Sequence, residues 1–168
     1  MTLQPRLDTP NGQAFNRFPS GADLEPLCSF DIRFGSVPTV PTPTGTRMLF
    51  SVVSGSVSGQ SLRGDIVPGS IDWVTIGSDG VARVEVRAMI HTHDGAFIQL
   101  TTTGRADLGK HIDRFLAGEE VLASEAYIRT CPMFETTDER YDWLNRVVAV
   151  ARCDLSISRI LYNVSSLR

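Results

Sequence analysis

The chain has 168 residues, 42% of them apolar, which is enough for one domain that buries most of its apolar surface. Its net charge of −3 and its 16 Lys and Arg residues, which form no cluster in the sequence, argue against nucleic-acid and anionic-membrane partners. Because no apolar run is long enough to span a membrane and no signal-peptide pattern opens the sequence, we expect a cytoplasmic protein.

The N-terminal region differs in character from the rest of the chain. Residues 1–25 lack hydrophobic periodicity and are rich in turn-forming residues, which predicts an irregular arm before a single domain over residues 26–168. Residues 28–34 then alternate strictly between apolar and polar, the pattern of a half-buried strand. A proline-rich loop over residues 38–45 separates this strand from a second one, expected over residues 47–57.

The middle of the chain has the punctuation of an antiparallel meander. Three glycines mark points where strands bend or another backbone approaches closely: Gly55, Gly59 and Gly64. Three turns are predicted from their sequences: Pro68-Gly69, Asp79-Gly80 and Asp94-Gly95. They delimit strands over residues 71–76, 81–92 and 96–103. The connections are short and no helix alternates with the strands, which argues against a parallel α/β sheet.

The last third adds one helix and more strands. Helical spacing of apolar residues predicts a short surface helix over residues 107–118 that covers one end of the fold. Further strands are expected around residue 127, over residues 143–147 and over residues 155–164. Eight or nine antiparallel strands bury their edges most readily by closing into a barrel. The fold class is therefore all-β, a small antiparallel β-barrel of about eight strands with one short helix and room for one small ligand.

Residues 127–147 concentrate aromatic and charged side chains around a loop broken by proline. Tyr127 and Arg129 alternate onto one face of the first predicted strand, and Trp143 and Asn145 onto one face of the second. Glu135 lies in the loop between them. An apolar lining with a carboxylate, a guanidinium and a phenol suits a small-molecule site, and a purely structural role is the alternative.

The strand over residues 81–92 has one polar and one apolar face. Solvation of the polar face is the simpler interpretation of this pattern. The alternative directs Glu85, Arg87 and His91 into a polar cavity as acid, anchor and proton carrier.

Two histidines form an HxH pair at the end of the same strand. His91 and His93 could bind a metal if Glu85, Asp94 or His111 supplied a third ligand, although Asp94 is already explained by a hairpin turn. The three cysteines show no CxxC spacing, and no phosphate-binding or dinucleotide-binding motif is present. We therefore expect neither a metal nor a cofactor.

Several short motifs together resemble one family. They are GTR at 45–47, PGSIDW at 68–73, THDG at 92–95, YIRTCPMFET at 127–136 and YDWLN at 141–145. With the three glycines above, they make the chain resemble the domain of unknown function family 3237 (DUF3237, uncharacterised protein family UPF0311) over residues 26–164. The resemblance implies a small antiparallel barrel, similar to lipocalin-like and cyclase-like barrels, with a central cavity.

The family pattern also indicates candidate site residues. The matching positions are Arg47, Asp72, Trp73, Arg87, Tyr127, Arg129, Glu135, Trp143 and Asn145. The chain departs from the pattern at His93, where an acidic or amide residue is more usual, and over residues 107–122. These departures affect the expected polarity of the pocket and the shape of its cover.

Two hypotheses for function follow. The first is a cofactor-free lyase or isomerase acting on a small apolar or aromatic molecule with a carbonyl or hydroxyl group. Its expected residues are Asp72 or Glu135 as base, Tyr127 as acid, Arg47, Arg129 or Arg87 as anion holder, Trp73 and Trp143 as wall, and Asn145 as a further substrate contact. The second is a non-catalytic binding module for such a molecule, or an accessory subunit of a larger enzyme. The expected partners are this small ligand and, as one option, a second copy in a homodimer.

Overall fold

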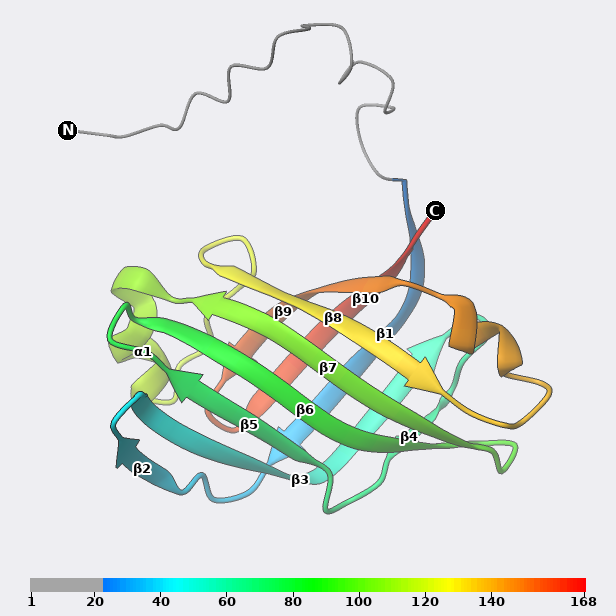
Figure 1. Ribbon diagram of the computed structural model, residues 1–168, viewed down its shortest axis with the longest axis horizontal. Helices are drawn as coiled ribbons and strands as arrows, with labels where there is room; N and C mark the ends of the chain where they lie inside the picture. The colour runs from blue at the N-terminus through cyan, green and yellow to red at the C-terminus, as the bar shows by residue number, and fades with distance from the viewer. Residues whose placement is uncertain (1–22) are drawn as a thin grey trace, which may run out of the picture.

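The computed structural model describes residues 23–168, which contain ten strands, one α-helix and two 3-10 helices (Figure 1). The strands are β1 (Leu24–Phe34), β2 (Thr39–Thr42), β3 (Gly45–Gly59), β4 (Gly64–Ile66), β5 (Ile71–Ile76), β6 (Val81–Thr92), β7 (Phe97–Asp107), β8 (Tyr127–Glu135), β9 (Ala149–Ser156) and β10 (Arg159–Leu167). The helices are η2 (Gly109–His111), α1 (Ile112–Leu116) and η3 (Asp142–Arg146).

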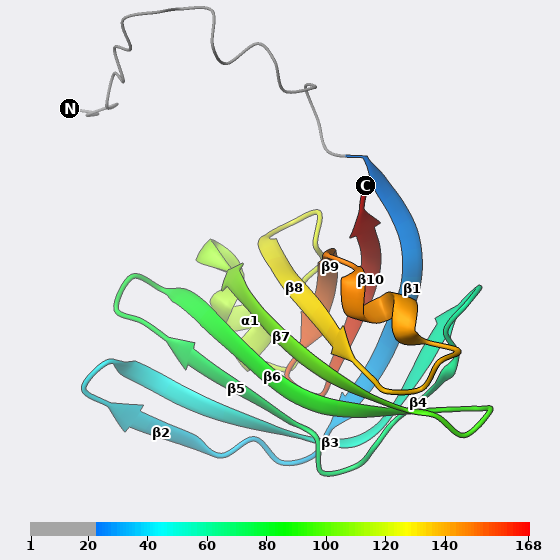
Figure 2. The same cartoon turned by 45° about the vertical axis from the view of Figure 1, so that its right-hand side comes forward.

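The strands form one closed antiparallel sheet, as predicted. Their order is β1-β10-β9-β8-β7-β6, after which β4 and β5 share the next position and both pair with β3. Pairing of β1 with β3 closes the ring, so the barrel has eight strand positions, and β2 pairs only with β3. In Figures 1 and 2, β5 to β8 form the near wall of the barrel and β1, β9 and β10 the far wall.

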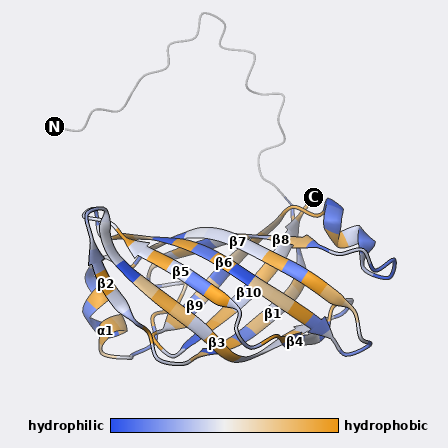
Figure 3. Cartoon of the chain, turned by 60° about the horizontal axis from the view of Figure 1, so that its bottom comes forward, coloured by the Kyte–Doolittle hydropathy of each residue, from blue (hydrophilic) through white to orange (hydrophobic). Residues whose placement is uncertain are grey.

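The alternation of residue types decides which side chains face inward. In β6 the even-numbered residues from Ala82 to Ile90 are buried, and the odd-numbered residues from Arg83 to His91 are exposed. The polar face of this strand is therefore solvated, which confirms the simpler interpretation of its sequence. Figure 3 shows the same alternation of hydrophilic and hydrophobic residues on β3, β5 and β6.

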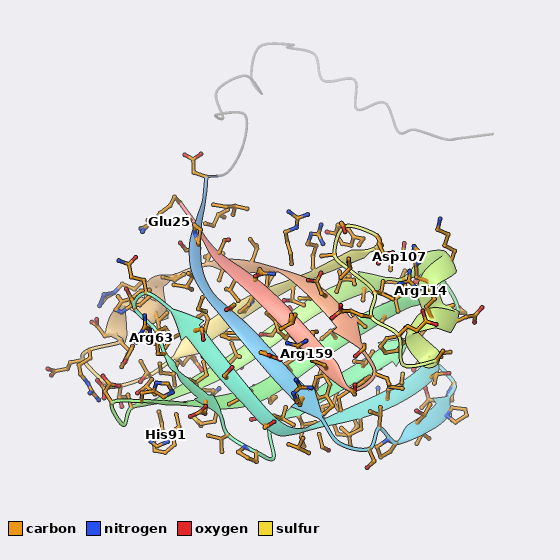
Figure 4. The ribbon with its side chains drawn as sticks, turned by 180° about the vertical axis from the view of Figure 1, so that it is seen from behind. Glu25, Arg63, His91, Asp107, Arg114 and Arg159 are labelled. Carbon is orange, nitrogen blue, oxygen red and sulfur yellow. The ribbon has the colours of Figure 1, made fainter. Side chains whose placement is uncertain are left out.

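The two ends of the barrel are filled differently. The end that η3 covers is packed solid by fully buried aliphatic side chains: Leu62, Ile66, Ile90, Ile98 and Leu144. Each such side chain stabilises the fold by about 2 kcal/mol relative to exposure. The other end is covered by α1, from which Phe115 reaches into the core. In Figure 4, Asp107 and Arg114 lie at the α1 end, whereas Arg63 and His91 lie at the opposite end.

The predicted turns and close approaches are confirmed. Gly69, Gly80 and Gly95 have φ angles of 89°, 75° and 93°, a region that side chains disfavour. At Gly64, an added Cβ would lie 2.4 Å from the His91 carbonyl oxygen, so only glycine lets β4 approach β6 this closely.

Four predictions about the elements are wrong. The loop predicted over residues 38–45 contains β2, and Glu135, predicted in a loop, is the last residue of β8. Residues 143–147 are not a strand, because η3 occupies residues 142–146 and buries Leu144 completely. The alternation of residue types at 143–147 does not reflect strand pairing. The Asn145 side chain is hydrogen-bonded to the backbone of Thr136 instead. The last predicted strand is the hairpin of β9 and β10, which turns between Ser156 and Arg159.

The N-terminal arm predicted over residues 1–25 lies outside the described residues except for residues 23–25. Of these, residues 24 and 25 already belong to β1. Between residues 23 and 168, no helix has the length and apolarity that crossing a membrane requires.

Candidate functional site

The α1 end of the barrel encloses a cavity of about 60 Å³. Its walls are mostly apolar and come from opposite walls of the barrel. Among the lining residues are Phe50, Val74, Val84, Ile128 and Ile160. Phe115 of α1 and Leu108 close it from the end. A volume of this size, open to a water-sized probe, holds about four waters. A ligand as large as one aromatic ring therefore fits only if the side chains around the cavity rearrange.

The cavity exists because small residues face the interior at this end. Ala82 and Ala106, which are opposite each other on β6 and β7, leave space where larger side chains would meet. Beside them, an added Cβ on Gly104 would lie 2.5 Å from the Cγ2 atom of Thr130. The absence of a side chain at Gly104 thus lets β7 and β8 come together at the cavity wall.

Asp72 is the one carboxyl group that lines this cavity. The alternation along β5 turns it inward, opposite Phe50 on β3 and Val86 on β6, while Trp73 points outward. Asp72 is 5% exposed, and its Oδ1 atom is buried without a hydrogen-bond partner in the described part of the chain. Burial without a compensating cation raises the pKa of Asp72 to about 7. The group is therefore partly protonated at neutral pH.

Besides Asp72, the cavity is lined by two buried polar residues, Tyr162 and Thr130, and by Arg105 and Ser156, which are more exposed. Tyr162 of β10 is buried against Phe30, with ring centroids 5.7 Å apart. Burial raises the pKa of Tyr162 well above its ordinary value, and the negative charge of Asp72 raises it further. The Oγ1 atom of Thr130 lies 3.9 Å from the Sγ atom of Cys153, whose pKa burial raises to about 12. The phenol and the thiol are therefore neutral, and Asp72 is the group that can exchange a proton near pH 7.

Four of the other predicted site residues lie in two pairs on the outer wall. The Arg47 guanidinium lies over the Trp73 ring, 5.8 Å from its centroid, and Trp73 is 42% exposed. Arg129 lies over the Tyr127 ring at 5.2 Å, and Tyr127 is 60% exposed. Neither pair reaches the cavity that contains Asp72.

The remaining four lie near the η3 end. Arg87, Glu135 and Asn145 line an outer groove of about 620 Å³ between β8 and η3. Glu135 accepts a hydrogen bond from Gln99 at 3.1 Å, and Asn145 donates to and accepts from the Thr136 backbone at 2.9 Å. Trp143 is half-buried against the core. The structure thus distributes the predicted residues over two outer surfaces and one interior position, that of Asp72.

The two histidines of the HxH pair lie outside the barrel. His91 stacks on Phe97 with ring centroids 4.5 Å apart, and His93 lies 3.7 Å from Asp65. Among residues 23–168, no group of three potential metal ligands gathers.

Sequence reasoning missed Tyr162 and Thr130. A usable signal was present, because Ile160, Tyr162 and Val164 alternate on one apolar face, which places a phenol among inward-facing residues. The position of Asp72 among the apolar residues of β5 was the stronger signal of the same kind, since an acid on an inward face needs an explanation.

The closed barrel and the buried Asp72 together define the class of protein. It is a small antiparallel β-barrel with an apolar interior cavity and one titratable carboxyl group in the cavity wall. The chain belongs to the family described as "Protein of unknown function (DUF3237)", which it matches over residues 22–167. The resemblance stated from the sequence motifs is thereby confirmed.

Relatives by sequence carry little functional information. A UPF0311 protein of Clostridium acetobutylicum is 36% identical over 101 residues, which are 60% of this chain and 64% of the relative, slightly less than two thirds. A UPF0311 protein of Bradyrhizobium diazoefficiens is 28% identical over 84% of this chain and 94% of the relative. A hydroalkoxylation enzyme of Penicillium herquei is 27% identical over 61% of this chain and 54% of the enzyme.

Solved structures share the barrel. A conserved protein of unknown function from Rhodopseudomonas palustris superposes with a TM-score of 0.84 at 23% identity, covering 89% of this chain and all of that one. A β-barrel-like protein from Acinetobacter baumannii has a TM-score of 0.75 at 28% identity, covering 90% of this chain and 99% of that one. An enzyme from Penicillium herquei has a TM-score of 0.64 at 22% identity, covering 88% and 97%. The likeness to the first and third of these concerns the fold alone.

Proposed function

We propose that this protein is a cofactor-independent lyase or isomerase, in which Asp72 moves a proton on a small, largely apolar molecule held in the barrel cavity. The observation that carries the proposal is the buried Asp72 carboxyl group, with one oxygen unpartnered, in an otherwise apolar wall. Leaving such a group without a partner costs about 1–3 kcal/mol or more, so a structural role explains it poorly. A ligand hydroxyl or carbonyl group would supply the missing partner.

The protonation of Asp72 suits general acid-base catalysis. A pKa of about 7 means that the acid and the carboxylate are both populated at neutral pH. One group can then donate a proton at one point of a reaction and accept one at another. The neutral phenol of Tyr162 can hold the substrate oxygen by donating a hydrogen bond. Glu135, the other predicted base, is bound to Gln99 on the outer wall, so the proposal rests on Asp72.

Hydroalkoxylation, the activity named for the Penicillium herquei relative, belongs to this reaction class. In its intramolecular form a proton adds to one alkene carbon, the hydroxyl oxygen bonds to the other, and the oxygen loses its proton. No electrons are gained or lost, and substrate and product are isomers. Asp72 as acid would deliver the first proton, and its carboxylate would take the second. The substrate would be a small phenol or alcohol with an unsaturated side chain.

A suitable test uses 2-(3-methylbut-2-enyl)phenol, whose cyclisation to 2,2-dimethylchroman leaves the mass unchanged and removes the phenolic O–H. We expect turnover by the protein at neutral pH, loss of at least about a hundredfold in Asp72→Asn, and retained binding measured by thermal shift. Glu135→Gln is the matched control and should keep its activity. Equal activity in Asp72→Asn and the unaltered protein would refute the assignment. Binding of such phenols without turnover of any would favour the binding-module hypothesis.

A further inference from the structure

A row of five arginines crosses the outer wall of the barrel. The strand register places Arg47 opposite Thr75, and Thr75 opposite Arg83. It then places Arg83, Arg105, Arg129 and Arg152 opposite one another on β6, β7, β8 and β9. We call the five residues Arg47, Arg83, Arg105, Arg129 and Arg152 the arginine row. In Figure 1, β6, β7 and β8 run side by side across the near wall, and β5 lies between β6 and β3.

The arginine row is unfavourable by itself. Residues directly opposite on neighbouring antiparallel strands have Cβ atoms about 5 Å apart, and like charges in such pairs destabilise the sheet. The row holds five of the 16 Lys and Arg residues of a chain whose net charge is −3. The fold thus brings together on one surface five arginines that are far apart in the sequence.

Carboxylates neutralise little of this charge. Arg83 pairs with Asp79 at 2.7 Å, and it is the one member of the row with an ion pair among residues 23–168. Arg105 and Arg129 donate to backbone carbonyl groups of their own strands at 2.8 Å. Other acids lie on the same outer face. Glu85 lies two residues from Arg83 on β6, Asp107 two residues from Arg105 on β7, and Asp154 two residues from Arg152 on β9. None of these three forms an ion pair with the row, and Asp154 instead accepts a hydrogen bond from the Ala123 backbone.

We propose that the arginine row binds an extended acidic peptide segment of a partner protein, laid across strands β3 to β9. A guanidinium group can bind a carboxylate through two parallel hydrogen bonds, so a series of arginines suits a series of Asp and Glu side chains. Arg47 and Arg83 line a surface groove of about 430 Å³ at one end of the row, and Asp79 and Glu85 belong to the same lining.

The shape of the surface favours a peptide over other polyanions. The row follows the convex wall of a barrel, so neither a flat bilayer nor a rigid duplex can touch all five arginines. A single-stranded nucleic acid could follow the curve, but it is held chiefly by bases that stack on exposed aromatic faces. The guanidinium groups of Arg47 and Arg129 lie over one face of Trp73 and Tyr127, the two rings beside the row, which are otherwise 42% and 60% exposed. An acidic peptide needs no free ring.

The test is binding of a fluorescein-labelled peptide of ten glutamates, followed by fluorescence anisotropy at low ionic strength. We expect saturable binding that weakens as salt rises. Arg129→Ser combined with Arg152→Ser should weaken it by roughly tenfold or more, without lowering the melting temperature, because removing opposed like charges does not cost stability. Neither residue lines the cavity that contains Asp72.

The matched control is Arg33→Ser combined with Arg63→Ser, which removes the same charge from exposed positions outside the row. Retained binding in this control supports the proposal, and an equal loss in both double variants would show an effect of net charge alone and overturn it. Absence of binding at low salt would also overturn it. So would tighter binding of a thymidine decanucleotide than of the peptide, which would identify the occupant as a nucleic acid.

Discussion

Replacing Asp72 by asparagine should change how the stability of the barrel depends on pH. The pKa of Asp72 is about 7 in the folded protein and 3.8 when the side chain is unperturbed. Between these values the folded chain binds more protons than the unfolded chain, so the free energy of unfolding falls as pH rises. For one group with this shift, the loss between pH 5 and pH 8 is about 2 to 3 kcal/mol, and it levels off above the folded-state pKa. Asparagine cannot ionise, so this loss should be absent in Asp72→Asn.

The assay is urea unfolding of the unaltered protein, Asp72→Asn and Glu135→Gln at pH 5 and at pH 8, with the free energy extrapolated to water. Ionisations other than that of Asp72 are common to all three proteins to a first approximation, so the difference between the curves isolates the replaced group. Glu135→Gln removes a carboxyl group from an exposed position and is the matched control. Parallel dependences for Asp72→Asn and the unaltered protein would refute the reasoning, because they would mean that Asp72 is ionised in the folded state as readily as in water.

Three further predictions concern the walls of the cavity and the cysteines. Gly104→Ala should lower the free energy of unfolding by about 1–3 kcal/mol. The added Cβ would lie 2.5 Å from the Thr130 side chain and 2.6 Å from the Arg129 carbonyl oxygen. An unchanged thermal midpoint would show that β7 and β8 separate freely. Phe115→Ala should lower the free energy of unfolding, measured by chemical unfolding, by about 3–5 kcal/mol. Leu116→Ala, at a position 54% exposed, should lower it by under about 1 kcal/mol. Equal losses would mean that α1 does not seal the barrel. Iodoacetamide should modify the native protein at Cys131 alone, because Cys28 and Cys153 are buried and their pKa values are raised to about 12; mass spectrometry of peptides would reveal labelling elsewhere.

Most of the strands, the turns and the class of the fold could be predicted from the sequence. Alternation along residues 81–92 and glycines after Pro68, Asp79 and Asp94 act through neighbouring residues, so they can be read without knowing the register. The same local rules failed at residues 143–147, because Leu144 and Asn145 take their conformation from contacts with the core and with Thr136.

Which residues meet in space became clear from the closed barrel and its register. Alternation shows that Asp72 and Tyr162 each face inward, but their common cavity depends on how β5 and β10 are placed in the closed ring, 90 positions apart in the sequence. The segment at 127–147 carries the densest chemistry in the sequence, yet its strand directs Tyr127, Arg129 and Glu135 outward. The arginine row likewise arises from the register of six strands. Local turn residues can set the register of a hairpin such as that of β6 and β7, whereas the pairing of β1 with β3 that closes the ring joins segments that no turn connects.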